Sequence, residues 1–169
     1  MTTFQSVKLR KGFTLIELII VVAIIAIIAA TVFVALDPGK RLHVSRNSRR
    51  WADVTAVAKA VRLYETDNAG LPSGIDLDAS SVQMLGTASA CPPADCTGVT
   101  FPGSNCFVSL TSDLSTYLKG IPLDPLNGTD SNTRYYVNRN GGVITVGACD
   151  AEGESAGGSG TAPTISVSQ

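Results

Sequence analysis

The sequence contains few of the residues from which catalytic and metal sites are usually built. It has one histidine, His43, in 169 residues. No Ser-His-Asp or Cys-His arrangement can be assembled around His43, which lies in a basic segment. No phosphate-binding loop or dinucleotide-binding fingerprint is present either. The sequence therefore indicates a protein that is not an enzyme, with His43 as a surface residue.

Charge is also scarce, and one long stretch almost lacks it. Charged residues make up 16% of the chain and the formal net charge is −1, a balance that does not predict nucleic-acid binding by the whole molecule. From Phe13 to Leu36 the only charged residue is Glu17. A helix of this length spans about 36 Å, whereas the hydrocarbon core of a bilayer is about 30 Å thick. The stretch is therefore predicted to cross a membrane as a helix.

The residues before this span form a short basic leader. Residues 1–12 include Lys8, Arg10 and Lys11 but no apolar core, so they are not a Sec-type signal by themselves. The leader ends in Gly-Phe-Thr-Leu-Ile-Glu at positions 12–17, directly before the apolar run. This combination resembles the class III signal of type IV prepilins and type II secretion pseudopilins.

The resemblance implies a processing site and an assembly charge. A membrane peptidase is expected to cut after Gly12 and to N-methylate the new first residue, Phe13. Glu17 is then the fifth residue of the mature chain and is expected to pair with the Phe13 amine of a neighbouring subunit. A carboxylate at the centre of a bilayer costs about 2.5–3.5 kcal/mol, and pairing reduces such a cost. Glu17 would thereby set the axial register of helices that otherwise slide on apolar surfaces.

The resemblance also implies an α+β fold of the pilin type. A long N-terminal helix, with a transmembrane half and an amphipathic half, is expected to carry a small antiparallel β-sheet. We expect a leader peptide at 1–12, a transmembrane or filament-core helix at 13–36, a basic juxtamembrane segment with an amphipathic helix at 37–72, a globular β region clipped by disulfides at 73–150, and a flexible tail at 151–169.

Partners and location follow from the same resemblance. The expected partners are identical or related pilin subunits, the prepilin peptidase and, indirectly, an inner-membrane platform protein and an assembly ATPase; nucleic acid is not expected. The precursor should cross the inner membrane once with its C-terminal domain outside, and the assembled subunit should lie in a filament at the cell surface. Counting basic residues on the two flanks of the span gives the opposite orientation, but the leader motif is the more specific signal.

The region after the span is predicted to contain a helix break, a basic run and an amphipathic helix. Proline in Asp37-Pro38-Gly39 predicts a kink or break in the helix. The basic run at 40–50 contains no acid and is interpreted as a solvated helix face near lipid headgroups, with a DNA-contacting stripe as the alternative. An amphipathic helix is predicted at 51–68, where apolar residues at spacings of three and four form a packing stripe of Trp51, Val54, Val57, Ala58, Val61 and Tyr64.

The rest of the chain is rich in turn residues. A hairpin is predicted from two short strand-like runs at 134–139 and 142–146, joined by a type I′ turn at Asn140-Gly141. The remaining expectations are loops at 72–102 and 122–132, a short strand at 106–110 and a helical turn at 111–119.

Four cysteines behind a span indicate an oxidising exterior and disulfides at Cys91, Cys96, Cys106 and Cys149. Of the three possible connectivities, the sequence favours Cys91–Cys96 with Cys106–Cys149. Zinc is the alternative, but the spacing of the first pair lacks a matching second half.

The segment 124–130 resembles the Asp-Pro-Trp-Gly-Asn loop of major pseudopilins, with Leu126 in place of tryptophan. Asp124, Asn127 and Asp130 are weak calcium candidates there, because their oxygens do not follow the spacing of a known calcium loop. A surface loop of Asx turns is the alternative interpretation, and no cofactor is expected.

The function predicted from these observations is that of a structural subunit of an extracellular type IV pilus-like filament. The alternatives within the family are the major pseudopilin of a type II secretion system and a DNA-binding competence pilin. The alternative outside it is a secreted enzyme or binding domain on a simple membrane anchor.

Overall fold

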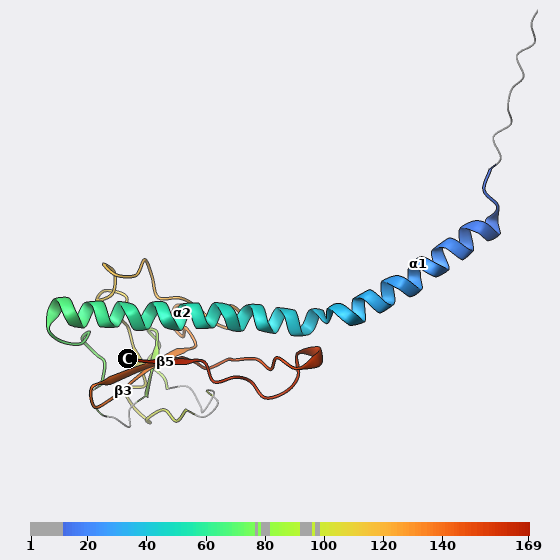
Figure 1. Ribbon diagram of the computed structural model, residues 1–169. Helices are drawn as coiled ribbons and strands as arrows, with labels where there is room; N and C mark the ends of the chain where they lie inside the picture. Colours follow the sequence, from blue (N-terminus) through green and yellow to red (C-terminus); the bar gives the residue numbers. More distant parts are fainter. Residues whose placement is uncertain (1–11, 77, 79–81, 92–95, 97–98) are drawn as a thin grey trace, which may run out of the picture. The chain divides into compact units, whose positions relative to one another are not determined.

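The computed structural model describes residues 12–169 except 77, 79–81, 92–95 and 97–98. The chain divides into two compact units, Met1–Pro38 and Gly39–Gln169. Helix α1, Leu15–Leu36, belongs to the first unit (Figure 1). Nearly all of helix α2, Pro38–Asn68, and a five-stranded sheet belong to the second, so the α+β expectation is confirmed. The predicted leader lies outside the described residues except for Gly12.

The predicted helix break between the units is confirmed. Helix α1 ends at Leu36, and Asp37 adopts the left-handed conformation at φ 41°. Helix α2 then begins at Pro38. Proline suits the first position of a helix because its ring fixes φ at a helical value and its missing N–H has no partner to lose there.

Helix α2 packs one face against the sheet. Its buried hydrophobic residues include Val54, Val57 and Val61, as the predicted stripe requires. Trp51 was wrongly placed in this stripe, since it is 41% exposed. Arg50 occupies the corresponding buried position, four residues before Val54. The buried face thus continues toward the start of α2 through polar side chains, which a search for apolar periodicity does not detect.

The sheet contains one parallel pair, so it is mixed rather than wholly antiparallel as expected. Its order is β2-β1-β3-β4-β5, with only β1 and β2 parallel. The strands are β1 Val82–Leu85, β2 Phe107–Val108, β3 Tyr135–Asn140, β4 Val143–Ala148 and β5 Ser166–Ser168. Strand β1 falls in a segment predicted to be loop. All four of its residues are buried, so it lacks the alternation that marks a strand with one solvated face.

The predicted hairpin is confirmed, but its turn differs. Asn140 pairs with Val143 as the last rung between β3 and β4, so the connecting residues are Gly141 and Gly142. Only Gly141 has a positive φ, 61°, whereas a type I′ turn needs positive φ at both central residues. The turn thus lies one residue further along the chain than predicted.

The C-terminal segment is structured, so the expectation of a flexible tail is wrong. Strand β5 pairs with β4, and Ile165 is only 1% exposed within the core. A short 3-10 turn, Ala156–Gly158, precedes it. The composition of this segment is poor in apolar residues, but β5 uses the hydrogen-bonding edge of β4 and needs only one deeply buried anchor.

The four cysteines form two disulfides with a different pairing from the one favoured. Cys91 bonds Cys106, and Cys96 bonds Cys149. The amide of Met84 donates to the carbonyl of Cys106 at 2.6 Å, which fixes Cys106 beside β1. Proximity in sequence had suggested Cys91–Cys96, but the sheet decides which cysteines meet. All four cysteines are used in these two disulfides, so none remains free.

Candidate functional site

The predicted cleavage site lies directly before helix α1. Gly12 and Phe13 are not helical, and Phe13 is 89% exposed. Thr14 is the N-cap of α1, with an extended backbone at φ −79° and ψ 152°. The Gly12–Phe13 peptide bond is therefore in a non-helical segment.

Glu17 and Thr14 together form a capping box. The Glu17 carboxylate accepts a hydrogen bond from the Thr14 amide at 3.2 Å and one from its hydroxyl at 3.3 Å. In return the Thr14 hydroxyl accepts from the Glu17 amide at 3.3 Å. This arrangement satisfies two N–H groups that the first turn leaves unpaired, and it places a negative charge at the positive end of the helix dipole. Glu17 thus has a local role within its own helix.

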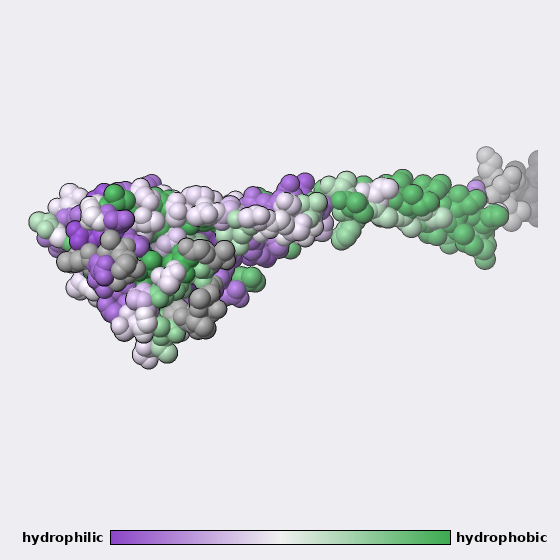
Figure 2. Space-filling view, turned by 90° about the horizontal axis from the view of Figure 1, so that it is seen from below, coloured by the Kyte–Doolittle hydropathy of each residue, from purple (hydrophilic) through white to green (hydrophobic). Residues whose placement is uncertain are grey.

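Helix α1 is apolar on all sides and buries none of its residues. Its isoleucines, valines and leucines are about half to three-quarters exposed, and Figure 2 shows the visible face of the helix as hydrophobic along its length. By length and composition, the helical stretch Leu15–Asn68 is the one in the described chain that can cross a membrane. A helix with no polar face is stable in a bilayer or among other helices, and not in water alone.

A comparison with protein families gives independent information about the N-terminal region. Residues 7–33 match the prokaryotic N-terminal methylation motif. The chain carries a class III signal peptide. This signal is that of type IV pilins and pseudopilins, and it indicates a prepilin-type precursor that is anchored in the membrane, processed by a prepilin peptidase and assembled with other pilin-like subunits. No curated protein and no solved structure matches the chain.

The solvated face that the sequence predicted for the basic run is confirmed only in part, since Lys40, Arg41 and Arg49 are exposed whereas Arg50 is buried. The side chain of Arg50 is completely buried, and its guanidinium donates to both oxygens of Asp124, at 2.6 and 3.1 Å. Arg50 also donates to Glu152 at 2.8 Å. Burial opposes the charged form of Arg50, but these hydrogen bonds outweigh it and raise its pKa. The sequence did not indicate that these two acids are partners of Arg50, because they lie 74 and 102 residues after it in the chain.

Glu152 joins the C-terminal segment to the start of α2. Its carboxylate accepts from Arg46 at 2.5 and 2.6 Å as well as from Arg50. Its backbone is held by Asn47, which donates to the Glu152 carbonyl at 2.7 Å and accepts from the Glu152 amide at 3.0 Å. The hydrogen bonds from Arg46, followed by those from Arg50, lower the pKa of Glu152 to about 2 against the opposing effect of burial.

His43 extends the same junction and is not a simple surface residue. One ring nitrogen, Nδ1, lies 2.9 Å from the Gly153 carbonyl oxygen, and the other lies 3.4 Å from a Glu152 oxygen. We refer to His43, Arg46, Asn47, Arg50, Asp124 and Glu152 as the polar junction. In Figure 1 the C-terminal loop runs beside the first half of α2, in agreement with these contacts.

Asp124 is the only calcium candidate that is buried, and its oxygens already have partners. Besides Arg50, it accepts from the amides of Leu126 and Asn127 at 2.9 and 3.2 Å, as in an Asx turn. Burial raises the pKa of Asp124, but the hydrogen bonds from Arg50 and the two amides lower it below its ordinary value. Asp130 is exposed and not joined to Asp124. Among the described residues, no cluster of three or more acids, histidines or cysteines suits a metal.

Proposed function

We propose that this protein is a structural subunit of an extracellular type IV pilus-like filament. The observation that carries the proposal is helix α1, a helix of exposed apolar residues that directly follows a methylation motif. In the precursor the bilayer covers this surface, and in the filament the helices of other subunits cover it. Burial of apolar area among packed helices is the driving force of assembly, and the function needs no cofactor.

Processing begins at the Gly12–Phe13 bond. The bond precedes the N-cap, and both residues are exposed, so a membrane peptidase can bind this segment without unwinding α1. Cleavage leaves a cationic amine on Phe13, which the same enzyme methylates.

Glu17 then exchanges one partner for another. In the precursor its carboxylate caps its own helix through Thr14. In the filament it pairs with the Phe13 amine of a neighbouring subunit, because an unpaired carboxylate among apolar helices is costly. The pair fixes the axial register of α1 helices whose apolar surfaces would otherwise allow sliding.

The proposed partners are identical or related subunits, the prepilin peptidase, an inner-membrane platform protein and an assembly ATPase. The precursor crosses the inner membrane with the unit Gly39–Gln169 outside, and assembly moves it to the cell surface. The two disulfides support this location, because disulfides persist in oxidising compartments. They also favour a pilin over a major pseudopilin, the alternative within the family.

The first test is the intact mass of the protein in sheared surface material and in membranes. We expect sheared filaments to contain a chain that lacks residues 1–12 and carries one methyl group on Phe13. An uncut chain confined to membranes of cells that contain the peptidase would refute the proposal and leave an anchored domain of another function.

The second test separates assembly from anchoring. Glu17→Ala should abolish surface filaments while the processed protein stays in the membrane. Glu65→Ala is the matched control, because Glu65 is a half-exposed acid of α2 in a surface pair with Arg62. Unchanged filaments in Glu17→Ala would contradict the role of Glu17 in register.

The polar junction weakens the DNA-binding alternative. Three of the five basic residues of the run, Arg46, Arg49 and Arg50, are paired with acids of the same chain, so the run does not form a continuous basic stripe. Salt-dependent retention of DNA by the full chain would nevertheless restore that alternative, since phosphate contacts always weaken with salt.

A further inference from the structure

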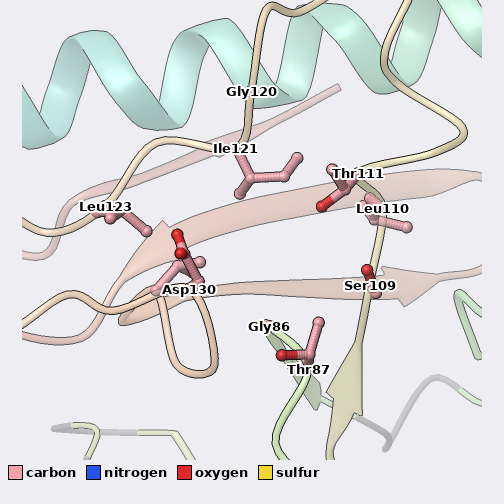
Figure 3. Close-up of a pocket in the computed structure, with 10 residues that line it drawn as sticks. Gly86, Thr87, Ser109, Leu110, Thr111, Gly120, Ile121, Leu123 and Asp130 are labelled. Atoms are coloured by element: carbon pink, nitrogen blue, oxygen red, sulfur yellow. The ribbon is translucent and has the colours of Figure 1, made fainter.

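A pocket with a volume of about 350 Å³ lies in the second unit, and no residue of the polar junction lines it. It is lined by the end of β1, the segment after β2 and the two loops before β3 (Figure 3). Its volume falls within the range of sites for small molecules, about 300–1,000 Å³. The processing and assembly of a filament subunit make no use of it.

Four polar side chains of the pocket have no partner of their own. Within the described part of the chain, the hydroxyls of Thr87, Ser109 and Thr111 and the carboxylate of Asp130 make no hydrogen bond or ion pair. The fifth, Thr133, differs because its hydroxyl donates to the Leu85 carbonyl at 2.8 Å and so serves the fold. All four residues are exposed, so their polar groups are accessible to a ligand.

The backbone beside Thr87 is firmly held. The amides of Thr87 and Ala88 both donate to the Ser131 carbonyl, at 3.1 and 3.0 Å, which fixes Thr87 relative to the neighbouring Asp130. Gly86 lies so close to the Ser131 backbone that any Cβ there would collide with it, and its φ of 154° is one that other residues rarely adopt. Because this backbone is already held, less entropy is lost in ordering it when a ligand binds.

Figure 3 shows how the lining is distributed. Asp130 and Leu123 lie on one side, Ser109 and Thr111 on the opposite side, with Ile121 above and Thr87 below. Hydroxyls both donate and accept hydrogen bonds, whereas a carboxylate only accepts. Ile121 and Leu123 add an apolar wall. Among the described lining residues there is no lysine, arginine or histidine, so the pocket does not favour an anion.

We propose that this pocket binds one sugar unit of a glycan. A neutral sugar ring presents hydroxyl donors to Asp130, donors and acceptors to the three hydroxyls, and an apolar C–H face to Ile121 and Leu123. This proposal goes beyond the proposed structural function and does not depend on it, because the site lies within one subunit. It would make the subunit a glycan-binding protein as well as a filament component.

The test is a titration of the full processed chain, ¹⁵N-labelled and in detergent micelles, followed by amide chemical shifts. The probes are the methyl glycosides of glucose, galactose and mannose and N-acetylglucosamine, at concentrations up to about 50 mM to detect millimolar affinity. We expect at least one sugar to shift the amides of Thr87, Ser109, Thr111 and Asp130. The double variant Asp130→Asn/Thr111→Val should weaken binding about tenfold, because a charge-assisted hydrogen bond and a hydroxyl contact are lost.

Thr116→Val is the matched control, since Thr116 is an exposed threonine outside the pocket. It should leave the affinity unchanged, and an otherwise unchanged spectrum of the double variant would show that it folds. The single variant Asp130→Asn provides a second measurement if the double variant does not fold. Absence of shifts with every sugar, or equal affinity in the Asp130 variants, would overturn the proposal. Shifts with ethanolamine or tetramethylammonium but with no sugar would also overturn it, because they would identify a cation site.

Discussion

The buried pair of Arg50 and Asp124 gives the sharpest prediction about the stability of the second unit. Both side chains are completely inaccessible to solvent. Removing one member of such a pair leaves a buried charge without its partner, at a cost of about 3–5 kcal/mol. For a unit of this size, Gly39–Gln169, Arg50→Met should therefore lower the unfolding temperature by about 10–20 °C.

Arg62→Met is the matched control for this change. Arg62 pairs with Glu65 at 2.7 Å, but their side chains are 39% and 37% exposed. Exposed pairs contribute about 0–1 kcal/mol, so the unfolding temperature should fall by less than about 4 °C. The assay is thermal unfolding of the full chain, with disulfides intact, followed by circular dichroism in detergent.

A double variant separates the effect of losing the ion pair between Arg50 and Asp124 from the effect of losing packing. Asp124→Asn keeps an oxygen for the amides of Leu126 and Asn127 while removing the carboxylate charge that Arg50→Met leaves unpaired. Arg50→Met/Asp124→Asn should thus be more stable than the sum of the two single changes by about 1–3 kcal/mol. Equal effects of Arg50→Met and Arg62→Met, or strict additivity in the double variant, would refute the assignment of Arg50 as a buried paired charge.

Three further predictions concern the C-terminal segment and the disulfides. The folded-state pKa of Glu152 is about 2, below its ordinary value of 4.5, so the stabilisation that Glu152 provides should be complete above about pH 4.5 and disappear as the pH falls toward 2. Arg46→Gln should therefore raise the pH at the midpoint of acid unfolding. The control Arg62→Gln should leave that midpoint unchanged. Ile165→Ala should destabilise the second unit by about 2–5 kcal/mol in the same thermal assay. The control Val143→Ala, at a half-exposed position, should have a small effect. Equal effects of the two changes would mean that the C-terminal segment is not part of the core. Peptide mapping without reduction, after cleavage at Asp95, Val99 and Lys119, should recover Cys91 linked to Cys106 and Cys96 linked to Cys149. Recovery of Cys91 linked to Cys96 would contradict the fold around β1.

The features that can be predicted from the sequence alone are local ones. The apolar run of α1, the break at Pro38, the stripe from Val54 to Val61 and the hairpin of β3 and β4 depend on residues that are close together in the chain. Hydrophobic periodicity, proline chemistry and turn preferences act over such distances and can be read directly. The processing signal is also local, because a peptidase recognises a short segment, and the match at residues 7–33 agrees with it.

Contacts between residues far apart in the chain could not be predicted from the sequence, because they depend on how the whole chain folds. The partners of Arg50, the disulfide pairing, the burial of Ile165 and the strand β1 all depend on contacts between segments far apart in the chain. A basic residue appears as a surface charge until an acid from another segment is placed against it, and a cysteine has no preferred partner until the sheet brings two sulfurs together. The pocket around Asp130 has the same origin, because the residues that line it come from four segments that become neighbours only when the sheet has formed.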